Sequence, residues 1–159
     1  MFNENLEWKL PISRHQARES ALQVLYAHVL TNTPVSVLLK ELLTAENEVY
    51  PAVRFFQKLV KRVHENQVVL DEYIRRHSEN WRLNRIAIVD LILLRMGVCE
   101  FLFFPEIPPK VTIDEAVELA KRYSTEKSGA YINGILDAIL DELKAENKII
   151  KNKRGMKEH

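Results

Sequence analysis

Apolar residues recur at helical spacing along most of this chain, and the clearest helix start comes first. Ser13 followed by Gln16 is a capping-box pattern, in which each side chain satisfies a backbone amide of the first turn. The apolar positions that follow lie on one helix face: Ala17, Ala21, Val24, Leu25 and Val29. They predict a first helix from about Arg14 to Leu30.

Prolines predict the next helix starts. Pro34 and Pro51 stand where a helix begins, because the amide hydrogen that proline lacks would have no partner in the first turn. After Pro51 the apolar positions keep a 3.6-residue rhythm over about six turns. We therefore expect one long amphipathic helix that ends near His77.

Residues 86–104 are apolar on all sides and predict a buried central helix that Asn84 caps and the following prolines end. The segment approaches membrane-spanning length, but Asp90, Arg95 and Glu100 are costly in a bilayer, so we expect no membrane segment. Arg95 lies five residues after Asp90, about 140° around the helix, so the two cannot pair on one face. We expect Arg95 to pair elsewhere in the bundle.

Two helices are predicted in the last third of the chain. Thr112 with Glu115 is a second capping-box pattern, and a final helix follows the break at 124–125. Gly134 lies inside that final helix, where glycine is unfavourable unless another helix packs closely, so we expect close packing there. No strand candidate remains. The predicted fold class is all-α, a compact bundle of about six to seven helices.

Composition fits one helical domain. The chain has 159 residues, 47% of them hydrophobic, and only 4 Gly and 6 Pro, too few for the turns of a β-sandwich or barrel. Its single cysteine, Cys99, lies among apolar residues, which indicates a buried thiol. The first residues lack the pattern of a secretory signal, so we expect a cytoplasmic protein.

Catalytic motifs are absent from the sequence. There is no glycine-rich phosphate loop, no nucleophile elbow and no pair of histidines at metal-binding spacing. Adjacent carboxylates occur at Asp114–Glu115 and Asp141–Glu142, where solvated helix charges are the ordinary explanation. We predict no enzyme, no cofactor and no metal site.

Three basic clusters could contact nucleic acid, although the net charge is only +1. The tail, residues 144–159, has six Lys and Arg against two Glu, and a second stripe lies on one helix face at Arg54, Lys58, Lys61 and Arg62. Solvated charge explains both equally well. The third cluster has nearby aromatics, Tyr26 and Tyr131, that could stack on bases. Its basic residues are Arg14, His15, Arg18, Lys121, Arg122 and Lys127.

The last cluster lies in the most distinctive part of the sequence. Residues 110–123, KVTIDEAVELAKRY, with TEKS at 125–128 and YINGILD at 131–137, closely resemble the signature of the NusB family of bacterial transcription antitermination factors. Segments 17–26, 81–85, 89–95 and 100–102 agree in order and spacing. The resemblance covers most of residues 13–143, which we treat as the helical domain. An N-terminal extension, 1–12, and the basic tail, 144–159, lie outside it.

The resemblance implies a fold of two small three-helix bundles with an extra helix. It also implies a function: NusB-like proteins bind the boxA element of ribosomal-RNA leaders together with NusE, a small-subunit ribosomal protein. The pair joins RNA polymerase and suppresses premature termination, and no reaction is catalysed. Both a monomer and a homodimer remain open.

Site residues follow from the same resemblance. The family's arginine-rich motif falls on Arg14, His15 and Arg18, but His15 and Gln16 replace arginines, so fewer phosphates can be neutralised. The resemblance places Tyr131 against a base and Asp90 against NusE. A packed core tyrosine and a paired helix carboxylate are the structural alternatives for these two positions.

Two other functions are compatible with the same residues. One is a helical protein-binding module without RNA, which the diluted arginine motif favours. The other is the RNA-positioning module of a ribosomal-RNA cytosine methyltransferase, whose family carries this fold at its N-terminus. We disfavour the second, because the residues after 143 leave no room for a methyl-donor domain.

Overall fold

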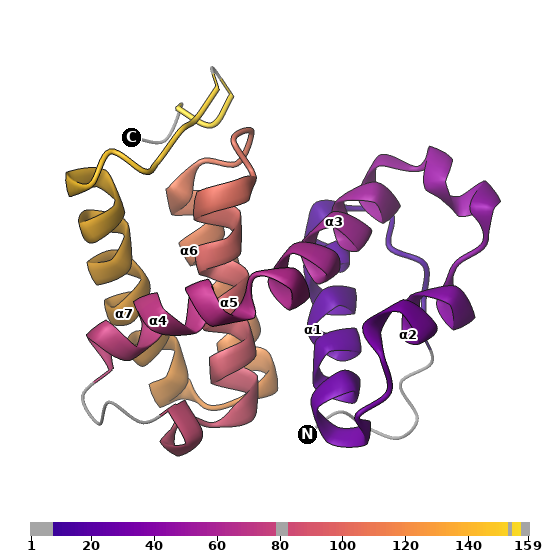
Figure 1. Ribbon diagram of the computed structural model, residues 1–159, viewed down its shortest axis with the longest axis horizontal. Coiled ribbons are helices and arrows are strands. Elements are labelled where there is room, and N and C mark those ends of the chain that lie inside the picture. The colour runs from indigo at the N-terminus through magenta and orange to yellow at the C-terminus, as the bar shows by residue number, and fades with distance from the viewer. Residues whose placement is uncertain (1–7, 79–82, 153, 157–159) are drawn as a thin grey trace. The chain divides into compact units, whose positions relative to one another are not determined.

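A computed structural model describes residues 8–78, 83–152 and 154–156, and these residues form seven α-helices and two short 3₁₀ helices without a strand (Figure 1). The predicted all-α class is therefore confirmed. The chain divides into two compact units, residues 1–65 and 66–159. The first has three α-helices and the second has four, in line with two three-helix bundles and an extra helix.

The first unit contains α1 (Arg14–Thr31), α2 (Val35–Leu42), the 3₁₀ helix η1 (Ala45–Val49) and α3 (Pro51–Glu65). Ser13 begins α1 as predicted, because its Oγ accepts a hydrogen bond from the Gln16 amide at 3.1 Å. Helix α1 packs against α2 and α3. Its core is made by the apolar faces of these helices, and the Trp8 ring lies 5.3 Å from the ring of the buried Phe56.

The second unit contains α4 (Gln67–His77), the 3₁₀ helix η2 (Leu83–Arg85), α5 (Ile88–Phe103), α6 (Pro109–Tyr123) and α7 (Glu126–Ala145). Helix α5 contacts α4, α6 and α7, so it is the central helix that the sequence predicts. Cys99 is completely buried in it, as expected. Figure 1 shows α6 and α7 running beside α5.

The single long helix expected from Pro51 to His77 is wrong. Helix α3 ends at Glu65 and α4 begins at Gln67, and Asn66 between them has ψ of 16°, outside the helical range. The buried residues of α3 belong to the first unit and those of α4 to the second. Apolar periodicity does not reveal such a division, because both segments keep the same rhythm.

Two predicted caps are also wrong. Asn84 lies in η2, and α5 begins only at Ile88. Helix α6 begins at Pro109, because proline is well suited to the first helical position, and Thr112 is therefore inside the helix. Its hydroxyl donates to the buried Glu100 carboxylate at 2.9 Å instead of capping.

Arg95 pairs away from Asp90, as the sequence predicts. Its Nε and Nη2 donate to the two carboxylate oxygens of Asp71 on α4, at 2.7 and 3.0 Å. This bidentate arginine–carboxylate geometry is among the strongest forms of ion pair. Within the described ranges, no helix has the length and apolar character needed to cross a bilayer.

Candidate functional site

The start of α7 is fixed by a cluster of hydroxyl groups around Ser128. Thr125 caps the helix, since its Oγ1 accepts from the Ser128 amide at 3.1 Å. The Ser128 Oγ lies 3.0 Å from the hydroxyls of both Ser124 and Thr125 and donates to Asp90 Oδ2 at 2.9 Å. Asp90 therefore joins the start of α7 to α5.

Asp90 is buried, with only 6% of its surface exposed. Its second oxygen, Oδ1, has no hydrogen-bond partner among the residues that the structure describes. A buried carboxylate that anchors a serine is a structural role, whereas the family resemblance places this position against NusE. The NusE contact stays a prediction, and the structure adds the anchoring role that sequence reasoning missed. The Thr125–Ser128 spacing could have revealed the start of α7, but nothing in the sequence pairs Ser128 with Asp90.

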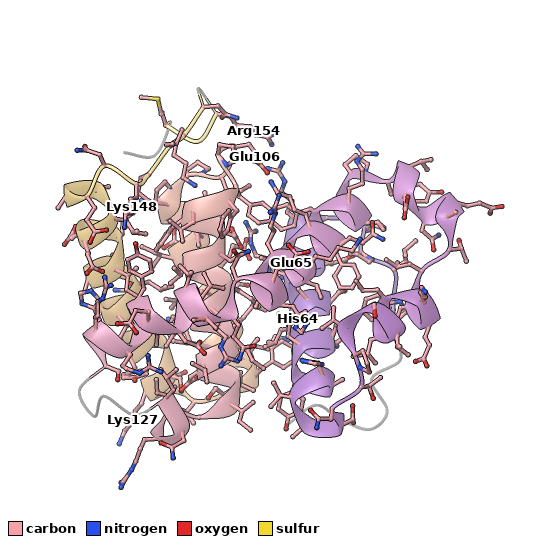
Figure 2. All side chains as sticks on the ribbon, in the orientation of Figure 1. His64, Glu65, Glu106, Lys127, Lys148 and Arg154 are labelled. Carbon is pink, nitrogen blue, oxygen red and sulfur yellow. The ribbon has the colours of Figure 1, made fainter. Side chains whose placement is uncertain are left out.

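Tyr131 lies at the margin of the apolar stripe of α7, as its helical phase predicts. The side chain is 37% exposed, so the alternative of a packed core tyrosine is wrong. Lys127, one turn earlier, is also exposed, and Figure 2 shows it at the N-terminal end of α7. A positive helix end, an ammonium group and a partly exposed ring thus lie within two turns of each other.

Lys121 of α6 comes close to the same part of α7. A Cβ built on Gly129 would lie 3.0 Å from Lys121 Cε and 3.1 Å from its Cγ, so the lysine stem passes over this glycine. Gly129 therefore allows the close approach of α6 and α7. The structure brings Lys121, Lys127 and Tyr131 to one end of the second unit.

The close packing that we expected at Gly134 is wrong. A Cβ built there meets nothing within 4 Å, and the residue is exposed. Close packing occurs instead at Gly97, where a Cβ would lie 2.8 Å from Leu136 Cδ2. Sequence position alone does not distinguish these glycines, because only the neighbouring helix decides which face is covered.

The predicted residues of the first unit lie on α1. The guanidinium carbons of Arg14 and Arg18 lie 5.4 and 5.1 Å from the centre of the Phe55 ring. Arg14 is half-buried, whereas Arg18 is only 3% exposed. An RNA contact of Arg18 stays a prediction, and in this position it requires the side chain to move.

His15 and Tyr26 have other neighbours than expected for a basic RNA site. His15 Nε2 lies 3.6 Å from Glu19 Oε1, one turn further along α1. Tyr26 lines a groove of about 400 Å³ together with the apolar side chains of Trp8, Leu30 and Leu38. The Glu19 carboxylate beside His15 disfavours a phosphate there, and the groove at Tyr26 is lined mainly by apolar side chains, with no Lys or Arg among them.

The basic tail is partly engaged by the second unit. Lys151 Nζ donates to the carbonyl oxygens of Glu100 and Phe104 at 3.1 and 2.8 Å, which satisfies the end of α5. Lys148 Nζ lies 2.8 Å from a Glu146 carboxylate oxygen and donates to the Tyr73 hydroxyl at 3.0 Å. The pKa of Lys148 is raised, mainly by the hydrogen bond to Glu146 and next by the hydrogen bond to Tyr73. The hydrogen bond to Lys148 in turn lowers the pKa of Glu146. Among the tail cations that the structure describes, Lys148 and Lys151 thus have protein partners.

The basic stripe on α3 is a further candidate surface. Arg54, Lys58, Lys61 and Arg62 line a shallow hollow of about 380 Å³. Arg54 also donates to the carbonyls of Glu48 and Val49, at 3.2 and 3.0 Å, so part of its role is to hold η1. This surface has no exposed aromatic among its lining residues.

Comparison with known proteins identifies the family. The NusB family model matches residues 15–141. The chain belongs to the NusB family. Two relatives named transcription antitermination protein NusB are 42% identical over 146 residues, from Chloroherpeton thalassium, and 41% identical over 145 residues, from Salinibacter ruber. Both alignments cover 91% of this chain, with 69% of the first relative and 91% of the second.

A solved structure adds the partners of another NusB-family protein. It is a crystal structure of the antitermination factors NusB and NusE in complex with dsRNA, and its matching chain is 30% identical with a TM-score of 0.70. The match covers 81% of this chain and 96% of that chain. The resemblance to the NusB family is therefore confirmed.

Changing the Asp90–Ser128 bond should destabilise the fold. Asp90→Lys should lower the free energy of unfolding by about 3 to 5 kcal/mol, because it buries an ammonium group and removes the acceptor of Ser128. Ser128→Ala should cost about 1 to 3 kcal/mol, since it leaves the buried carboxylate without this donor. Denaturant unfolding measures both changes.

The matched control is Asp137→Lys, which changes an exposed carboxylate of α7, the helix that carries Ser128. It should change the free energy of unfolding by no more than about 0.5 kcal/mol. Equal stability of the Asp90→Lys and Asp137→Lys proteins would contradict the anchoring role of Asp90.

Proposed function

We propose that this protein is an RNA-binding transcription antitermination factor that acts together with a NusE partner and catalyses no reaction. Membership of the NusB family supports the proposal, as does the likeness to a NusB chain that was solved with NusE and dsRNA. The observation on this chain that carries it is the start of α7, where the partly exposed ring of Tyr131 accompanies exposed lysines.

The chemistry of this face suits an RNA strand. An exposed aromatic ring stacks on any base, while lysines bind phosphates and set the position of the strand. Lys127 and Lys121 supply the ammonium groups, and the positive end of the α7 dipole adds to their attraction for phosphate. The Asp90–Ser128 bond holds this face in place, so the free protein already has its binding geometry.

The finer parts of the proposal come from the family resemblance. The RNA is a boxA-type element of ribosomal-RNA operons, NusE is the small-subunit ribosomal protein, and the complex acts on RNA polymerase in the cytoplasm. The protein partner contacts the second unit near Asp90. We call the surface around Lys121, Lys127 and Tyr131 the RNA face. A homodimer that covers the RNA face is an additional state, in which RNA and a second copy of the chain would compete for this surface.

One set of observations favours a second function, protein binding without RNA. Arg18 is buried, and Tyr26 lines an apolar groove rather than a basic surface. Both features weaken the N-terminal half of the predicted RNA site. Fluorescence anisotropy with a boxA-type RNA, alone and with NusE, separates the two functions, because a protein-only module binds NusE and leaves the RNA signal unchanged.

Removal of the Tyr131 ring should weaken RNA binding with little effect on folding. Tyr131→Ala should cost about 1 to 3 kcal/mol of binding free energy, the usual range for one lost base stack, and Tyr131→Phe should bind nearly as well. Because the side chain is partly exposed, the free energy of unfolding should change by less than about 1 kcal/mol. A large loss of stability with unchanged RNA affinity would refute the stacking role.

The salt dependence of binding should identify the phosphate contacts. Lys127→Gln should reduce the slope of log affinity against log salt by roughly 0.7 to 0.9 units, the effect of one lost phosphate contact. Lys61→Gln, an exposed lysine of the α3 stripe, is the control and should leave the slope unchanged. A reduced slope for Lys61→Gln with an unchanged slope for Lys127→Gln would instead assign the RNA surface to α3.

A further inference from the structure

Gly134 occupies a helical position where the fold gains nothing from a glycine. It lies in the interior of α7, is exposed, and has no positive φ that would exclude other residues. A Cβ at this position would meet nothing within 4 Å. Glycine is among the least favourable residues in a helix interior, so alanine would suit this fold better.

The other glycines of α5 and α7 differ from Gly134. A Cβ on Gly97 would lie 2.8 Å from Leu136 Cδ2, and one on Gly129 would lie 3.0 Å from Lys121 Cε. At Gly97 the Leu136 side chain fills the space that a Cβ would take, and at Gly129 the Lys121 side chain would have to shift slightly to admit one. Among the residues that the structure describes, none gives Gly134 the same reason, and we therefore look for the reason in what approaches α7 from outside.

Because glycine has no side chain, the backbone of α7 at Gly134 is accessible beside Tyr131. The Cα–Cβ bond of a helical residue tilts toward the N-terminus, so a side chain at 134 would cover the surface one turn earlier. Tyr131 is three residues before Gly134, and Lys127 is seven residues before it, so all three lie on one face. A ligand that reaches the Tyr131 ring can therefore also approach the α7 backbone at Gly134.

Charge favours an RNA strand as this ligand. The face carries Lys127 near the start of α7, where the neighbouring Glu126 is also exposed, and becomes acidic beyond Gly134, at the exposed residues Asp137 and Asp141. Phosphates are attracted to the first half and repelled by the second. Gly134 stands at the boundary, where the strand that follows a base stacked on Tyr131 would pass closest to the helix.

We propose that Gly134 is a positioning residue for RNA, which lets the strand lie against the α7 backbone while a base stacks on Tyr131. The inference rests on the proposed RNA-binding function and adds a steric requirement to it. Any side chain at this position separates the strand from the helix. RNA affinity and fold stability therefore make opposite demands on residue 134.

The test compares stability and RNA binding in the same full-length variants. Gly134→Ala should raise the thermal midpoint by about 2 to 4 °C, because alanine favours the helix and restricts the unfolded chain. The same variant should lower affinity for a boxA-type RNA about tenfold, measured by fluorescence anisotropy without NusE. Gly134→Lys should bind no better than Gly134→Ala, although its added positive charge alone would strengthen binding.

Two controls accompany these variants. Val68→Ala replaces a β-branched residue on α4 that is 85% exposed, so it should favour its helix without affecting RNA binding. Tyr131→Ala tests the proposed function itself. If Tyr131→Ala weakens RNA binding and Gly134→Ala does not, the role of Gly134 is refuted and the RNA face stands; if neither variant affects RNA binding, both are refuted.

Two more results would overturn the inference. A lower thermal midpoint of Gly134→Ala would show that the fold itself needs this glycine. Weaker NusE binding with unchanged RNA binding would show that a protein surface, and not the RNA strand, approaches residue 134.

Discussion

The hydrogen bond from Ser128 Oγ to the buried Asp90 carboxylate is the contact on which the proposed RNA face depends. It joins the first turn of α7 to the central helix of the second unit. Lys127 and Tyr131 lie one residue before and three residues after Ser128, so the same bond orients both. Since a buried carboxylate is costly without donors, the bond also makes any other placement of the α7 start unfavourable.

Other polar residues of α5 also fix the position of the segments that they bond. Each polar residue of this apolar helix serves a different segment of the second unit: Asp90 holds α7, Arg95 pairs with Asp71 of α4, and Glu100 accepts from Thr112 of α6. Its C-terminal carbonyls accept hydrogen bonds from Lys151 of the tail. Apolar burial is non-directional, whereas these bonds fix which helix lies against which side of α5.

The sequence predicted well what depends on local chemistry. The Ser13 cap of α1, the burial of the central helix and the partial exposure of Tyr131 follow from capping and helical phase. It failed where a distant segment decides the outcome. The burial of Arg18 depends on Phe55 of α3, and the break at Asn66 depends on which unit each apolar face joins. The packing expected at Gly134 fails because no described residue lies within 4 Å of a Cβ built there.

Crosslinking tests most directly whether the start of α7 is the RNA face. A boxA-type RNA with 4-thiouridine, bound to the full chain with NusE, would be irradiated, and the crosslinked tryptic peptides identified by mass spectrometry. Cleavage after Lys127 and Lys144 gives the peptide 128–144, which contains Tyr131 and Gly134. We expect crosslinks in this peptide. Crosslinks confined to the α3 stripe or to the basic tail would contradict the assignment of the RNA face to α7.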